Sequence, residues 1–276
     1  MNWSAALAAI SLAGSLVPPL FADDFAATTA TVGHGTNGLM TPVNQIVTPV
    51  GTQVQLPGMR PNALALSPDG KLLVTAGLTQ ELVVVDPTTG EISQHVPLLA
   101  DAVKEEAAGT AAILNANEKA KLSFTGLIFS PDGSRIYMAN VNGDIKVFTV
   151  GADKKVSPLG SFALSPAKAP ERNDEIPAGI AVSTDGKKIY VAGNLSNHLL
   201  ELDAATGKLL RTWDVGVAPF DVVLAGHKVY VSNWGGRQPS ADSITGPAGR
   251  GTLVRTDARS IANEGSVTVI DLTQDP

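Results

Sequence analysis

The sequence has no cysteine, no excess of positive charge and no long apolar run beyond its first 22 residues, and each absence excludes a class of protein. Without cysteine, the 276 residues can form no disulfide framework, thiolate nucleophile or cysteine-ligated metal site. A net charge of −6 argues against a general nucleic-acid binder. With 27 glycines and 18 prolines, long uninterrupted helices are not expected to dominate. A hydrophobic fraction of 44% with 17% charged residues is ordinary for a globular chain and argues against wholesale disorder.

Residues 1–22 form an uncharged, apolar stretch. It ends at Ala22, followed by two aspartates, and Pro18 and Pro19 would break a membrane helix. We expect residues 1–22 to be a secretory signal peptide, with a buried N-terminal helix as the alternative. Residues 23–43, rich in Ala, Thr and Gly, are expected to be a flexible lead-in. The protein is therefore expected in the periplasm or outside the cell, without a membrane span after cleavage.

One pattern then occurs four times, beginning at Ala63, Gly126, Gly179 and Asp221. Each copy reads as an apolar strand, a tight turn and a second strand, and a third strand follows. The turn is of the Asp-Gly kind in the first three copies, which also continue into a fourth strand. Four antiparallel strands per unit are typical of one propeller blade.

The spacing of the copies supports this interpretation. Val74, Tyr137, Tyr190 and Tyr230 are equivalent and lie 63, 53 and 40 residues apart. Removing the insertions at 99–121 and 164–176 makes every spacing 40, which lies in the range of propeller blades. We therefore predict an all-β protein, with a β-propeller of four-stranded antiparallel blades over residues 44–276. About four blades are expected, at residues 60–98, 122–163, 177–215 and 217–276.

Particular residues carry a resemblance to a known family. The Ser-Pro-Asp-Gly turns, the strand ends Tyr190-Val-Ala-Gly193 and Tyr230-Val-Ser-Asn233, and a third strand from Val267 to Asp271 resemble the YVTN family of bacterial β-propeller repeats. The resemblance covers about residues 60–273. The last part is also similar to secreted bacterial proteins that join such a propeller to an alkaline-phosphatase-like phosphoesterase domain. Nothing in these residues matches that domain or its metal ligands, so its hydrolase activity is not carried over.

The fourth repeat lacks an outer strand, and an orphan strand is expected at 52–56, where an outer strand belongs. Either this strand completes a closed four-bladed ring, or the chain is an open arc of a larger propeller. The open arc is favoured because the similar proteins are longer. An open arc would expose an apolar blade face and unpaired edges, which invite self-association or a partner.

Three insertions, at 99–121, 164–176 and 234–265, belong to the same rim of the propeller, opposite the short turns within the blades. Loops held by a rigid scaffold often carry function, so we expect this rim to be the binding face. The predicted function is a binding or scaffold module for a protein or a small anionic ligand. A hydrolase is the alternative, either a lactonase-like propeller or the propeller part of a phosphoesterase protein.

Candidate ligand-binding residues lie in two groups. The 234–265 loop holds four arginines suited to carboxylate or phosphate, with solvation or internal pairing as the alternative. Its Trp234 is either an exposed platform or packed beneath the loop, and the usual burial of tryptophan favours packing. Polar residues at the starts of the innermost strands would converge at the axis of a closed ring, again with structural or solvated charges as the alternative. The candidates are Arg60, Asn62, Asp221, Asn233, Trp234, Arg237, Arg250 and Arg255.

Two other kinds of site, a dinucleotide-binding loop and a histidine metal site, are not supported by the sequence pattern. Residues 33–38 fit G-x-G-x-x-G but have neither a preceding strand nor a following helix in the sequence pattern. The four histidines are scattered, and no pair has the spacing of metal ligands. We therefore expect no cofactor and no metal, and no catalytic set stands out.

Overall fold

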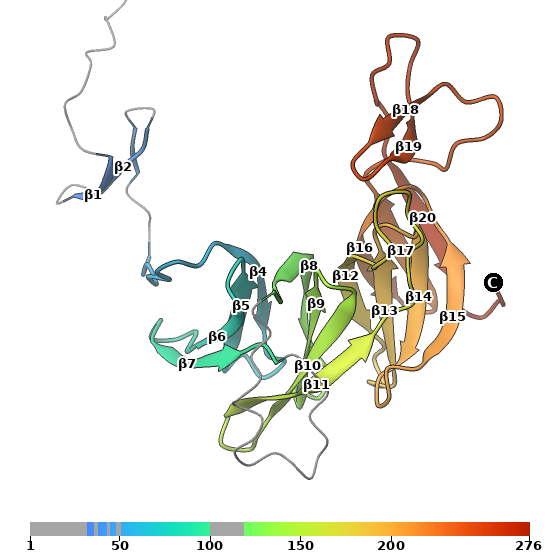
Figure 1. The fold of residues 1–276 in the computed structure, drawn as a ribbon. Coiled ribbons are helices and arrows are strands. Elements are labelled where there is room, and N and C mark those ends of the chain that lie inside the picture. Colours follow the sequence, from blue (N-terminus) through green and yellow to red (C-terminus); the bar gives the residue numbers. More distant parts are fainter. Residues whose placement is uncertain (1–31, 36–37, 43–44, 48–50, 100–118) are drawn as a thin grey trace, which may run out of the picture. The chain divides into compact units, whose positions relative to one another are not determined.

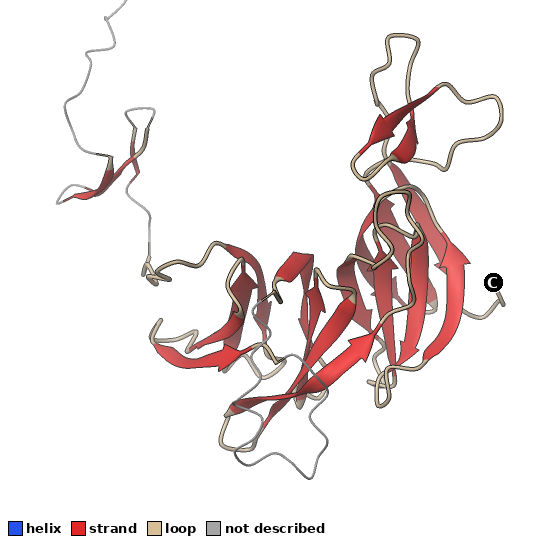
Figure 2. Ribbon diagram, viewed as in Figure 1, coloured by secondary structure: helices blue, strands red, loops and turns tan. Residues whose placement is uncertain are grey.

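The computed structural model describes residues 32–35, 38–42, 45–47, 51–99 and 119–276, and contains only strands, turns and loops there (Figure 2). The expected all-β class is confirmed. The chain divides into two compact units, Met1–Thr52 and Gln53–Pro276. The predicted signal peptide and most of the insertion at 99–121 lie outside the described residues.

The described part of the first unit is a small antiparallel sheet in the order β1 (Gly33–Gly35), β2 (Gly38–Met40) and β3 (Ile46–Val47). Gly33 lies opposite Met40 in this sheet. The lead-in expected over residues 23–43 therefore contains strand structure in its described part. Gly33 and Gly38 have φ angles of 127° and 118°, which glycine adopts without strain.

The second unit contains four successive antiparallel sheets, which we call blades 1 to 4 (Figure 1). Blade 1 comprises β4 (Pro61–Leu66), β5 (Leu73–Gly77), β6 (Glu81–Val85) and β7 (Ile92–Pro97). Blade 2 comprises β8 (Leu122–Phe129), β9 (Arg135–Asn140), β10 (Asp144–Val150) and β11 (Val156–Ala163). Blade 3 comprises β12 (Pro177–Val182), β13 (Lys188–Gly193), β14 (His198–Asp203) and β15 (Leu209–Asp214). Blade 4 has three strands, β16 (Pro219–Ala225), β17 (Lys228–Asn233) and β20 (Ser266–Asp271).

The long insertion in blade 4 carries a hairpin that the sequence pattern did not predict. Its strands are β18 (Thr245–Ala248) and β19 (Thr252–Arg255), which project beyond the blade (Figure 1). Both strands have only four residues, and β18 contains Pro247, so the alternating pattern of a strand is too weak to be recognised.

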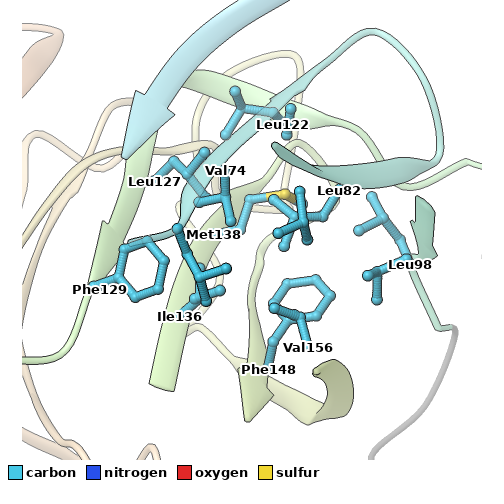
Figure 3. Packing of buried hydrophobic residues seen from close by; sticks show 14 of the residues in the cluster. Val74, Leu82, Leu98, Leu122, Leu127, Phe129, Ile136, Met138, Phe148 and Val156 are labelled. Atoms are coloured by element: carbon cyan, nitrogen blue, oxygen red, sulfur yellow. The ribbon is translucent and has the colours of Figure 1, made fainter. Parts of the chain in front are cut away.

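Neighbouring blades are held together by separate apolar cores. Between blades 1 and 2, Val74 and Leu82 pack with Met138 and Phe148 (Figure 3). A second cluster joins blades 2 and 3 and includes Tyr137, Ile145, Leu200 and Leu202. A third joins blades 3 and 4 and includes Tyr190, Trp213, Val229 and Val231. Each blade therefore obtains most of its hydrophobic stabilisation from contact with a neighbour.

The segment at 52–56, where an orphan outer strand was expected, does not complete blade 4 in this structure. Residues 52–56 pair with no described strand. Instead Val54, Leu56 and Met59 pack over Val83 and Val85 on the side of blade 1 that faces away from blade 2. The physical reason is that an outer strand needs a third strand beside it, whereas β20 pairs only with β17 here.

The first turn of blades 1, 2 and 3 repeats one hydrogen-bond pattern. In blade 1 the Ser67 hydroxyl donates to Asp69 Oδ1 over 2.6 Å and accepts from the Leu72 N–H over 2.9 Å. Ser130 with Asp132, and Ser183 with Asp185, repeat this arrangement. The serine hydroxyl bonds hold the pKa of all three aspartates below the usual value of 3.8.

This pattern predicts that part of the protein's folding stability is lost at acidic pH. Because the three pKa values are lower in the folded state, the stabilisation is present above about pH 4 and is lost as the pH falls through the folded pKa values. The triple variant Asp69→Asn, Asp132→Asn, Asp185→Asn keeps an acceptor oxygen but cannot titrate. Urea midpoints measured from pH 6 to about pH 2.5 should fall less steeply for this variant than for the wild type.

The matched control is Asp242→Asn, an exposed aspartate outside these turns. It should retain the wild-type dependence on pH. Equal slopes for the triple variant and the wild type would show that the turns do not contribute in this way.

Candidate functional site at the bulged ends of the inner strands

Each innermost strand is interrupted near its start by a change of register. Consecutive inner strands also lie side by side, β4 against β8, β8 against β12, and β12 against β16. The interruptions fall between Pro61 and Ala63, Leu122 and Leu127, Pro177 and Ile180, and Pro219 and Asp221. Bulges re-aim side chains and are frequent beside functional sites. The repeated interruption makes this end of the inner strands the candidate site.

Backbone strain is concentrated at two of these interruptions. Phe124 in β8 and Ala218 immediately before β16 have φ angles of 50° and 51°, in the left-handed region that glycine favours. Such residues cost on the order of 1–3 kcal/mol and persist where the surrounding structure holds them. The bulge in β8 thereby fixes the position of the Phe124 side chain.

Three aromatic side chains meet here. The Phe220 and Trp234 rings stack with centroids 4.2 Å apart and an interplanar angle of 10°. Phe124 meets both rings edge-on, at 5.4 Å from Phe220 and 6.3 Å from Trp234. We call Phe124, Phe220 and Trp234 the aromatic cluster. The sequence pattern singled out Trp234 and missed the two phenylalanines, because only the bulges bring them together.

Trp234 is 65% exposed, so the expectation that it packs beneath the 234–265 loop is wrong. The loop continues into the β18–β19 hairpin, which projects beyond the blade (Figure 1). One face of the indole rests on Phe220. The ring is therefore both accessible and held in place.

Asp221 lies next to this cluster in the chain and is exposed. Its Oδ1 accepts from the Val222 N–H over 3.0 Å, and its own N–H donates to Ser232 Oγ over 3.1 Å. On the neighbouring inner strand, a Cβ added to Gly179 would lie only 2.4 Å from Asp221 Oδ1. The absence of a side chain at Gly179 allows β12 and β16 to approach closely.

Arg60 and Asn62 are exposed, at the start of blade 1. The inner strands β8 and β12 separate β4 from β16, so the structure does not bring these two residues together with Asp221. Arg60 and Asp221 make no ion pair within the described part of the chain. Arg60, Asn62 and Asp221 would meet at a central axis only if the blades formed a closed ring.

Asn233 has a structural role in this chain. Its side chain is buried, and Nδ2 donates to Ser266 Oγ over 3.1 Å and to Thr268 Oγ1 over 3.0 Å. These bonds join β17 to β20 across the long insertion. The residue is therefore positioned to hold the site rather than to contact a ligand.

Three of the four loop arginines are paired internally. Arg237 lies 3.1 Å from Glu264 Oε2, and Arg255 Nε lies 2.9 Å from Glu264 Oε1 as an ion pair without hydrogen-bond geometry. The Arg237 hydrogen bond holds the pKa of Glu264 below its usual range. Arg259 pairs with Asp257 over 2.6 Å.

Arg250 is exposed near the tip of the hairpin, with a φ of 56° and no ion pair among the described residues. The other three loop arginines are paired internally, which is the alternative to ligand binding that the sequence analysis left open.

The described residues include no group of three or more His, Cys, Asp or Glu side chains suited to a metal ion. Within the same ranges, no helix is long and apolar enough to cross a membrane.

Comparison with known proteins supports the fold. No protein-family model and no curated protein matches the chain. Among solved structures, hydrazine synthase from Kuenenia stuttgartiensis aligns with a TM-score of 0.51 and 19% identity, over 82% of this chain and 50% of that one. The β-propeller domain of Cps50 (Swd1) from Myceliophteria thermophila aligns with a TM-score of 0.48 and 12% identity, over 66% of this chain and 51% of that one.

The chain thus spans about half the length of the solved structures it matches. Its successive antiparallel sheets and the similarity to hydrazine synthase confirm the predicted class, a β-propeller in an open arrangement, with no strand of blade 1 paired to blade 4 among the described strands.

The close approach at Gly179 gives a test of the site's architecture. Gly179→Ala places a methyl group against Asp221 and should lower the free energy of unfolding by about 1–3 kcal/mol through overpacking. Gly249→Ala is the control, since its added Cβ meets nothing within 4 Å, and should change it by less than about 0.5 kcal/mol. Chemical denaturation measures both. Equal stability of the two variants would contradict the close packing of β12 on β16.

Proposed function

We propose that this chain is a secreted or periplasmic binding module of the YVTN type, which captures a protein partner on the aromatic cluster at the bulged rim. The secreted or periplasmic location is part of the proposal, because residues 1–22 are expected to be a secretory signal peptide. The YVTN assignment rests on the repeated turn and strand-end residues, such as Ser67-Pro-Asp-Gly70 and Tyr230-Val-Ser-Asn233.

One observation carries the proposal. Trp234 is largely exposed, yet its ring is fixed by stacking on Phe220 and by the edge of Phe124. Tryptophan is enriched among the residues that dominate the energy of protein interfaces. A ring already held in one orientation loses little conformational entropy on binding, which favours affinity.

The charges near the rim favour a protein over a small anion. Arg237 and Arg255 already share Glu264, so binding an anion there would require breaking an internal pair. Asp221 adds a negative charge beside the aromatic cluster in sequence. An apolar ring with an acidic neighbour suits a partner segment that combines apolar and basic side chains.

The test is a selection of 12-residue peptides displayed on phage against the immobilised full chain. Peptides with apolar and basic residues should be enriched, and Trp234→Ala should weaken their binding about 30-fold or more, as truncation of an interface hot spot does. Leu253→Ala alters another exposed apolar side chain, in the β18–β19 hairpin, and should leave the affinity unchanged.

Peptides that bind equally well to Trp234→Ala would contradict the assigned site. Enrichment of acidic peptides that depend on Arg250 would favour the anionic ligand instead. Turnover of lactones or phosphoesters by the purified chain, lost in Asp221→Ala, would favour the hydrolase alternative over a binding module.

A further inference from the structure

The β18–β19 hairpin lies inside the chain, between β17 and β20, and projects beyond blade 4 (Figure 1). Its two strands form a sheet of their own, and neither pairs with a third described strand. Such a sheet has two outer edges, each with backbone N–H and C=O groups that point away from the partner strand. The register of the hairpin determines which groups each edge presents.

Two observations fix the hydrogen-bond pattern of the hairpin. The Thr256 N–H donates to the Ile244 carbonyl over 2.9 Å, one residue beyond the paired strands. These two residues are therefore a hydrogen-bonded pair, and bonded and non-bonded pairs alternate along an antiparallel ladder. Pro247 has no N–H to donate, and it lies opposite Leu253, where the alternation places a non-bonded pair.

The two edges present different groups. In a non-bonded pair, the N–H and C=O of both residues point away from the partner strand. On β19 these residues are Leu253 and Arg255, and no described residue hydrogen-bonds their N–H or C=O groups. On β18 they are Thr245 and Pro247, and the proline ring blocks that edge. The open edge of the hairpin is therefore that of β19.

The outer edges of blades 1, 2 and 3 carry a feature that discourages strand addition. Their outer strands β7, β11 and β15 each change register against the strand beside them. Bulges twist an edge away, and proline or lysine on an edge has a similar effect. The register of β18 with β19 runs without interruption, and β19 contains neither proline nor lysine. The β19 edge thus lacks these protective features.

The hairpin is held at its base and at its tip. At the base, Arg255 donates to Ser243 over 2.6 Å and forms an ion pair with Glu264. At the tip, a Cβ added to Gly251 would lie 3.2 Å from Pro170, in the loop between β11 and β12. An edge that is already ordered loses little conformational entropy when a strand is added to it.

We infer that β19 binds an extended segment of a partner protein, which adds to the hairpin as a third strand. The outward groups of Leu253 and Arg255 are two residues apart, which matches the alternate residues of an extended backbone. Leu253 is 52% exposed and offers an apolar neighbour, while the Arg255 charge is balanced by Glu264. The segment is therefore expected to be uncharged and rich in β-branched residues.

This inference concerns a surface other than the aromatic cluster and goes beyond the proposed function. Strand addition uses backbone groups of β19, whereas the proposed partner contact uses the Trp234 ring. Variants of one chain therefore test the two surfaces separately.

The test uses the same library of displayed peptides, selected on the immobilised full chain. A peptide that adds to β19 should bind Trp234→Ala as tightly as the wild type. Leu253→Pro removes an outward N–H but no hydrogen bond within the hairpin, and should weaken binding about tenfold or more. Thr245→Pro is the matched control, because it makes the same change at the edge that Pro247 already blocks. It should alter the affinity less than about twofold.

Backbone recognition has a signature that side-chain binding lacks. In a strand added to an edge, every second amide of the peptide points to that edge. Methylating the nitrogens of one alternate set should therefore abolish binding, and methylating the other set should leave it nearly unchanged. In hydrogen–deuterium exchange of the full chain, the Leu253 and Arg255 amides should exchange fast in the free chain and slowly with the peptide bound. Val254, whose amide faces β18, should be slow in both states.

Four results would overturn the inference. A selection that enriches no peptide, or only peptides that bind Leu253→Pro as tightly as the wild type, would show that nothing adds to β19. Equal weakening by Leu253→Pro and Thr245→Pro would show that the peptide does not recognise the β19 edge. Equal tolerance of both methylated sets would show that side chains rather than the backbone are recognised. Slow exchange of Leu253 and Arg255 in the free chain would show that other residues of the chain already cover the edge.

Discussion

Face-to-face packing between successive blades is the constraint on which the rest of this structure depends. Each sheet is too small to bury its apolar residues alone, and the large buried side chains lie between sheets. Phe148 and Met138, for example, are completed by residues of blade 1. Blades 2 and 3 have both faces covered by other blades, whereas blades 1 and 4 each have one face covered in this way. On the other face, blade 4 exposes Val223, Tyr230 and Val269, and blade 1 is partly covered by the segment that holds Val54 and Leu56.

The same packing positions the candidate site. Because consecutive inner strands lie side by side, their bulges gather at one end, and side chains distant in sequence come into contact. Phe124 and Phe220 are separated by 96 residues in the chain and meet edge-on at 5.4 Å. Gly179 allows this approach, and Asn233 anchors the last strand through Ser266 and Thr268. The exposed Trp234 ring thus depends on at least three blades for its position.

Local features of the chain could be predicted from the sequence. The tight turn expected at Ser67-Pro-Asp-Gly70 lies between β4 and β5, because a strand–turn–strand pattern is a short-range signal. The role of Asn233 was not predictable, since it depends on pairing with Ser266 across a long insertion. The exposure of Trp234 was not predictable, because tryptophan is usually buried and its surroundings here are set by contacts with Phe124 and Phe220 from distant strands. The pairing of Arg237 and Arg255 with one glutamate depends on the path of the whole loop. Residues 53–56 carry a strand pattern, but their pairing needs an edge that this structure does not place beside them.

The central claim is that contact between blades stabilises each blade, and hydrogen–deuterium exchange of the full chain tests it most directly. Amides of β9, β10 and β13, in the two blades covered on both faces, should exchange most slowly. Those of β20 and of β4, at the open ends, should exchange fastest among the blade strands. Equal protection in all four blades, or greater protection at the ends, would contradict the account.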